Sequence, residues 1–145
     1  MRNRELAVDY VRRADVRLKA IDVLLEAGSW ADVVRESQEA VELALKGLLR
    51  YVGIEPPRVH DVSDVLLAGQ DRLPEPLRAE VGRLAEISKE LRRDRELAFY
   101  GAEDLTPSGF YDRQDATDAR DAAYYAVRLV LAHVIPADDA VLPAD

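Results

Sequence analysis

The stretch WADVVRESQEAVELALKGLLRYVG, residues 30–53, carries the clearest helical pattern in the chain. Side chains of one buried face recur every three or four residues, as on an α-helix: Val34, Gln38, Val41, Leu45, Leu48 and Val52. The solvent side carries charges four residues apart, which can pair along the helix: Glu42, Lys46 and Arg50. Gly53 and the following prolines, Pro56 and Pro57, end this helix.

The same spacing predicts helices on both sides of this stretch. A first helix is marked by Leu6, Tyr10, Ala14, Leu18, Ile21 and Leu25. Asp61 is the predicted N-cap of a short helix that reaches Leu67, and Pro76 begins a long helix that ends before Gly101. Residues 102–112 form a predicted loop, and a last helix runs from Asp112 to Pro136.

No segment shows the alternation of a β-strand, so the prediction is an all-α fold. We expect an up-and-down bundle of four long helices plus one short helix. Residues 1–136 would form this helical domain, and residues 137–145 a flexible C-terminal tail.

Composition narrows the possible functions. The 145 residues include no cysteine, which excludes disulfides and thiol catalysis, and the two histidines are isolated, so we expect no metal site and no cofactor. No apolar run is long enough for a membrane span, and we expect a cytoplasmic protein. The net charge of −8 disfavours general affinity for nucleic acid, which depends on cations that neutralise phosphates.

One concentrated basic patch stands out against this acidic background, in and before RRDRELAFYG, residues 92–101: Lys89, Arg92, Arg93 and Arg95, with Tyr100 beyond them. Arg95 lies four residues after Leu91 and so continues an apolar stripe, where a guanidinium needs an anionic or polar partner. The patch is either a binding site or an ordinary helix end, where cations interact favourably with the negative end of the helix dipole.

The stretch from Trp30 to Leu67 resembles the HEPN domain family. The matching features are an aromatic residue that opens the helix, the sequence Gln-Glu-Ala-x-Glu-x-Ala-Leu-Lys at residues 38–46, a loop with prolines, and the pair His60 and Asp61 before a short helix. This resemblance implies a helical bundle that dimerises through the face with the family's motif. It also implies RNA or nucleotide binding and a separately encoded nucleotidyltransferase partner, as in toxin-antitoxin systems.

Many members of the family are metal-independent RNases whose motif is an Arg, four to six residues and a His. Here Tyr100 stands in place of the His, separated from Arg95 by four residues and from Arg93 by six. With an ordinary pKa of about 10, a tyrosine is a poor general base near neutral pH.

Three functions are therefore open. The chain is a homodimer that binds RNA or a nucleotide through Lys89, Arg92, Arg93, Arg95 and Tyr100, an RNase toxin in which Arg95 and Tyr100 are catalytic, or a dimerisation module without ligand. We favour the binding function, because it tolerates the replacement of His by Tyr better than catalysis does.

Overall fold

The computed structural model describes residues 2–100 and 106–135, without the side chains of residues 2, 94–100 and 107. Four helices are long: α1 (Arg2–Glu26), α2 (Trp30–Tyr51), α5 (Val81–Tyr100) and α7 (Arg113–Val134). The short elements are α3 (Ser63–Ala68), a 3-10 turn (Gln70–Arg72), α4 (Glu75–Ala79) and α6 (Pro107–Phe110). Every regular element in these residues is helical, which confirms the predicted all-α fold. The predicted tail, residues 137–145, lies outside the described residues.

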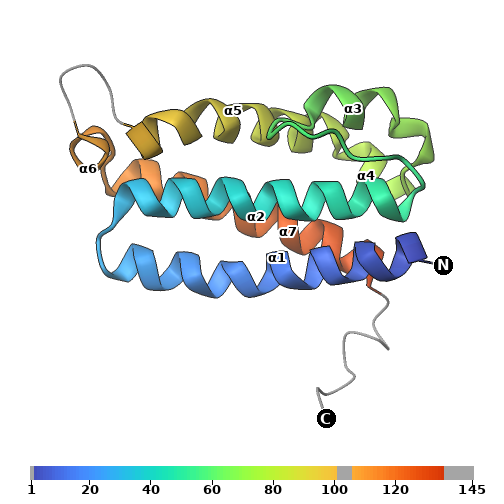
Figure 1. Ribbon diagram of the computed structural model, residues 1–145, viewed down its shortest axis with the longest axis horizontal. Helices are drawn as coiled ribbons and strands as arrows, with labels where there is room; N and C mark the ends of the chain where they lie inside the picture. Colours follow the sequence, from blue (N-terminus) through green and yellow to red (C-terminus); the bar gives the residue numbers. More distant parts are fainter. Residues whose placement is uncertain (1, 101–105, 136–145) are drawn as a thin grey trace, which may run out of the picture.

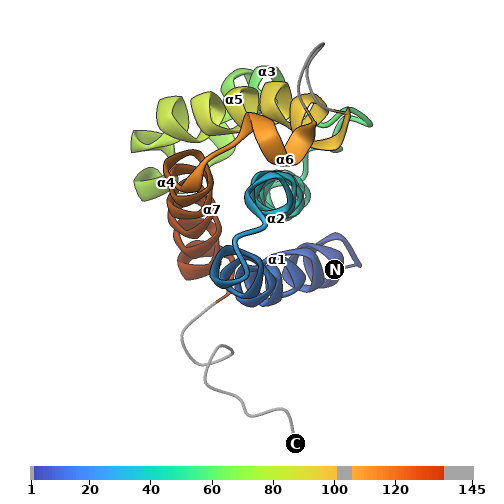
Figure 2. The ribbon, with the colours of Figure 1, turned by 90° about the vertical axis from the view of Figure 1, so that its left-hand side faces the viewer.

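Helix α2 lies in the middle of the bundle. It runs antiparallel to α1, and Gly28 makes the turn between them with a φ of 73°, which glycine adopts without strain. The view along the helices shows α1, α7 and α5 placed around α2 (Figure 2). Helix α3 and the chain before it cover the outer side of α5 (Figure 1). Each long helix therefore packs on α2.

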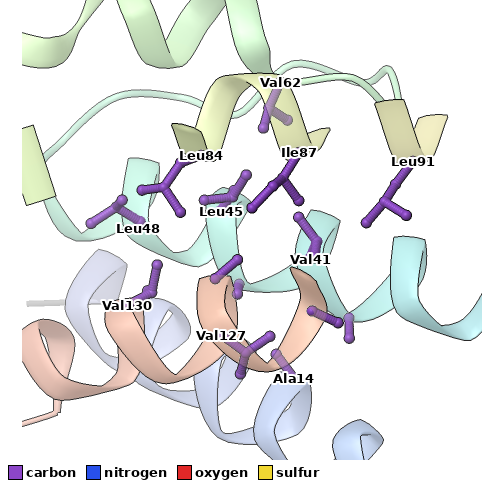
Figure 3. Close-up of a cluster of buried hydrophobic side chains, with 14 of the residues drawn as sticks. Ala14, Val41, Leu45, Leu48, Val62, Leu84, Ile87, Leu91, Val127 and Val130 are labelled. Carbon is purple, nitrogen blue, oxygen red and sulfur yellow. The ribbon is translucent and has the colours of Figure 1, made fainter. Parts of the chain in front are cut away.

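The apolar face of α2 fills the core between two of its neighbours. Val41, Leu45 and Leu48 project between α5 and α7 (Figure 3). Side chains from the surrounding elements meet them, all of them buried: Ala14, Val62, Leu84, Ile87, Leu91, Val127 and Val130. Removing this apolar surface from water is the main stabilising contribution to such a bundle.

Ion pairs and a tyrosine join α1 to α7 at the edge of the core. Arg120 Nε lies 2.8 Å from Asp22 Oδ1, and Arg128 Nε lies 2.9 Å from Asp15 Oδ1. The hydroxyl of Tyr124 donates to Asp22 as well. Partial burial raises the pKa of Asp22, but the hydrogen bonds from Tyr124 and Arg120 outweigh it and the net pKa is lowered. These contacts fix how α1 and α7 are aligned.

The predicted helix from Pro76 is in fact two helices. Helix α4 ends at Ala79, Glu80 is its C-cap with a φ of −104° and a ψ of 7°, and α5 begins at Val81. The Glu80 carboxylate accepts a hydrogen bond from Tyr125 on α7, and burial together with this bond raises the pKa of Tyr125 to about 12. The apolar period continues across the break, so the sequence pattern alone does not reveal it.

The predicted loop also contains a helix. Pro107 begins α6, and Thr106 Oγ1 caps it by accepting the backbone N–H of Gly109 at 3.2 Å. The start of the last helix is confirmed at Asp112, whose carboxylate accepts the N–H of Asp115 at 2.8 Å. Asp115 returns a bond to the Asp112 N–H, which completes a capping box.

Helices α1 and α2 approach closely because Gly47 has no side chain. A Cβ at this position would lie 2.9 Å from Cγ2 of Val11 and 3.1 Å from the carbonyl oxygen of Ala7. Both neighbours are held by the packing of α1, so they can retreat only if the two helices separate. The glycine therefore sets the distance between α1 and α2.

We expect Gly47→Ala to destabilise the protein by about 1–3 kcal/mol. Alanine is the better helix former, but the free-energy penalty of the overlap with α1 exceeds the gain in helix propensity. The matched control is Gly82→Ala in α5, where an added Cβ has no neighbour within 4 Å. That variant should be neutral or gain up to about 1 kcal/mol. Urea unfolding of both variants measures the difference. Equal stabilities would contradict the close approach at Gly47.

Candidate functional site

The basic patch lies along the C-terminal half of α5. The buried stripe that leads to it is confirmed: Leu84, Ser88 and Leu91 all face the interior. Lys89, Arg92 and Arg93 are exposed. The helix continues through Tyr100, but the side chains of Arg95 and Tyr100 lie outside the described part of the structure.

Lys89 and Arg93 face different neighbours. The charge of Lys89 acts on Asp61, in the segment before α3. Burial raises the pKa of Asp61, but its hydrogen bonds with Ser63 and Ser88 and the Lys89 charge together lower it. Arg93 instead lines a pocket near α6 and α7. Lys89 and Arg93 therefore lie one turn apart on the same face of α5 but have different neighbours.

The pocket at Arg93 has a volume of about 360 Å³. Its apolar wall includes Val34 of α2 and Leu91 of α5. Two aromatic rings complete it, Phe110 and Tyr111, with centroids 5.0 Å apart and planes at 72°. Three carboxylates also line it: Glu90, Asp115 and Asp118. The combination of one guanidinium, two rings and three acids gives the pocket both apolar and hydrogen-bonding character.

Two adjacent helix caps position the aromatic pair. Thr106 caps α6 on one side, and Asp112 caps α7 on the other. Tyr111 between them is buried, whereas Phe110 is 38% exposed. The ring of Phe110 is thus held at the mouth of the pocket, where a planar ligand can reach it.

A second polar cluster surrounds Glu42 of α2. Its carboxylate accepts from Gln38 Nε2 at 2.8 Å and lies 2.8 Å from Lys46 Nζ. Nδ1 of His60, from the loop before α3, lies 2.8 Å from the same carboxylate. Burial raises the pKa of Glu42, but the bonds from Lys46, Gln38 and His60 lower it by more, and the net pKa is lowered.

This cluster leads directly into contacts between the loop and α5. Ser88, only 3% exposed, accepts the backbone N–H of Val62 at 3.0 Å and donates to Asp61 Oδ1 at 3.1 Å. The predicted N-cap is wrong by one residue: Val62 holds that position, and Asp61 accepts the N–H of Ser63 at 2.9 Å. Glu42 and Ser88 therefore tie the loop to two helices.

Sequence patterns showed only part of the Glu42 cluster. The spacing of Glu42 and Lys46 predicted their ion pair but placed it in solvent, whereas both side chains are only 17% exposed. His60 joins the cluster from 18 residues away, and no local spacing indicates that contact. The aromatic pair of the Arg93 pocket lies in the predicted loop, residues 102–112, where no local pattern indicates a site.

Neither a metal site nor a membrane span is found in the part of the chain that the structure describes. Among the side chains that the structure describes, those of residues 3–93, 106 and 108–135, no three His, Asp or Glu come together in a way that could hold a metal ion. None of the helices in those ranges is long and apolar enough to cross a bilayer.

Three long helices, α1, α5 and α7, surround a central α2, and the polar cluster at Glu42 and the basic residues of α5 belong to this all-α bundle. The family model of the HEPN domain matches residues 7–133. The chain therefore belongs to the HEPN domain family. Searches of curated proteins and of solved structures each found no match.

The bonds to Glu42 should make stability depend on acid pH. Because its folded pKa is below the unfolded value of 4.5, this contribution is complete above that value and is lost as the pH falls through the folded pKa. We expect Glu42→Gln to lose about 1–2 kcal/mol at pH 7 and progressively less as the pH falls through the folded pKa of Glu42, below which both proteins carry a neutral group. Urea unfolding at a series of pH values below 4.5 measures this, and a loss that stays constant across the series would contradict it.

Proposed function

We propose that this HEPN protein is a homodimer that binds a nucleotide or RNA at the C-terminal half of α5. The binding residues would be Lys89, Arg92, Arg93, Arg95 and Tyr100. A separately encoded nucleotidyltransferase would be its partner in a toxin-antitoxin-like system. The observation that carries the proposal is the pocket at Arg93, which combines a cation with two aromatic rings.

The chemistry of the pocket favours a single nucleotide over a long RNA chain. Arginine binds phosphate oxygens in a fork geometry, and an aromatic ring such as Phe110 offers a stacking surface to any base. The nearby carboxylates, Glu90, Asp115 and Asp118, can accept hydrogen bonds from base amino groups or ribose hydroxyls. The same acids repel a polyanion, as does the net charge of −8.

Substitutions in the pocket test this site. We expect Arg93→Ala to weaken ATP binding by roughly tenfold to a hundredfold through loss of a phosphate contact. Phe110→Ala should weaken it by about tenfold, since base stacking is worth about 1–3 kcal/mol. Arg58→Ala, which removes an exposed arginine from the distant loop, is the control. Isothermal titration with ATP and AMP gives the affinities, and unchanged binding in both pocket variants would contradict the site.

The family motif is tested separately at Arg95 and Tyr100. Arg95→Ala should abolish binding without unfolding the protein, and Tyr100→Phe should show whether the hydroxyl takes part. Tyr100→His restores the histidine of the family and should create or raise RNA cleavage in EDTA if the remaining site is competent. General acid–base catalysis is commonly worth about 10²–10⁴-fold. A melting curve for each variant separates loss of function from loss of fold.

The dimer is a further part of the proposal. Its support is the family resemblance, since members dimerise through the face that carries the motif. Light scattering of the full chain at tens of micromolar should give twice the mass of 16.2 kDa. A monomer at that concentration would remove the composite site, whereas ATP binding by the monomer would retain the pocket at Arg93.

A further inference from the structure

Two aspartates of α7, Asp115 and Asp118, form one wall of the pocket at Arg93. They are three residues apart in sequence and therefore lie about one turn apart on the same side of the helix. Phe110, which also lines the pocket, comes shortly before the N-cap of α7. The pocket thus combines an aromatic ring and two carboxylates from neighbouring parts of the chain with a guanidinium from α5.

Hydrogen bonds within α7 orient both carboxylates. Asp115 Oδ2 accepts the backbone N–H of Asp112 at 3.0 Å as part of the capping box. Asp118 Oδ1 accepts from Gln114 Nε2 at 2.8 Å. A carboxylate has about four lone-pair sites, so one such bond leaves most of its acceptor capacity for a ligand. Oriented acceptors of this kind can distinguish bases that differ in their hydrogen-bond donors.

We propose that the pocket selects guanine among the four RNA bases, and that Asp118 is the residue that determines this specificity. The inference rests on the proposed function, because it requires that a nucleotide occupies the pocket. An ionised carboxylate only accepts hydrogen bonds, so the base must present donors to it. Guanine has two adjacent donors on one edge, N1–H and the 2-amino group, which pair with the two oxygens of one carboxylate.

The other three bases do not offer two adjacent donors. Adenine and cytosine each carry one amino group beside a ring nitrogen that accepts, and that nitrogen would face the carboxylate with the same sign of partial charge. Uracil has one N–H between two carbonyl oxygens. A site that is built to hydrogen-bond its ligand discriminates strongly against an analogue without the matching groups, because polar groups of the site are then left unpaired.

The remaining walls of the pocket agree with this placement of the base. A base stacked on Phe110, at the mouth, lies near the start of α7, where Asp115 and Asp118 can reach its edge. The phosphate is then bound by Arg93 on α5. The volume of about 360 Å³ is near the lower end of the range for ligand pockets, roughly 300–1,000 Å³, and suits a single nucleotide.

Isothermal titration of the full chain with GMP, IMP and AMP tests the specificity. IMP keeps N1–H but lacks the 2-amino group, and AMP lacks both donors of that edge. We expect the affinity to fall in the order GMP, IMP, AMP, by roughly tenfold or more between GMP and AMP, as is usual for hydrogen bonds to a charged group. In Asp118→Asn, GMP should bind about as weakly as AMP, because an amide has only one acceptor oxygen.

The matched control is Asp121→Asn, which removes the same charge one turn further along α7, at a residue that is not among the described residues lining the pocket. It should keep the wild-type affinity for GMP to within about twofold. A preference for GMP that survives Asp118→Asn would overturn the role of Asp118. A loss for 2′-deoxyGMP as large as that caused by Asp118→Asn would place the ribose at this carboxylate and overturn the proposal too.

Failure of this inference is distinguishable from failure of the nucleotide site. Equal affinities of the wild type for GMP and AMP, both weakened in Arg93→Ala, would overturn the guanine specificity and retain the site. Absence of binding by GMP, IMP and AMP alike would overturn both.

Discussion

Helix α2 packs against α1, α5 and α7 at once, and its three contact faces need side chains of different size. The face toward α1 needs a small residue, Gly47, because the two helices approach closely there. The faces toward α5 and α7 need large apolar side chains such as Leu45 and Leu48 (Figure 3). One helix can serve three partners only if its sequence is divided in this way along its circumference, because cores tolerate neither voids nor overlap.

The remaining strip of α2 carries the polar cluster at Glu42. A half-buried carboxylate is costly unless donors surround it, and Gln38, Lys46 and His60 meet that need. His60 brings the loop before α3 onto α2, and Ser88 holds the same loop against α5. The stretch that resembles the HEPN family therefore has a structural role here: it positions α5, and with it the surface that we propose for binding.

The packing of α5 and α7 on α2 also explains where the pocket at Arg93 lies. Helices α5 and α7 use their apolar faces on α2, and little apolar surface remains with which they could pack on each other. The pocket at Arg93 lies along this less closely packed side of the bundle.

The sequence by itself determined the long helices, since a period of three to four residues with caps such as Asp112 is a local property of the chain. It also predicted the buried stripe that leads along α5 to Leu91. It could not reveal the break at Glu80, across which the apolar period continues. Nor could it reveal the contact of His60 with Glu42, which forms only when the loop folds back on α2.

The different surroundings of Lys89 and Arg93 are likewise a property of the tertiary structure. Their spacing predicts that they lie one turn apart on the same face of α5, but it does not say which neighbours each side chain meets. In the folded chain the charge of Lys89 acts on Asp61, whereas Arg93 lines a pocket together with Phe110. A cation acquires a binding role from the groups around it, and those groups come from parts of the chain that only folding brings together.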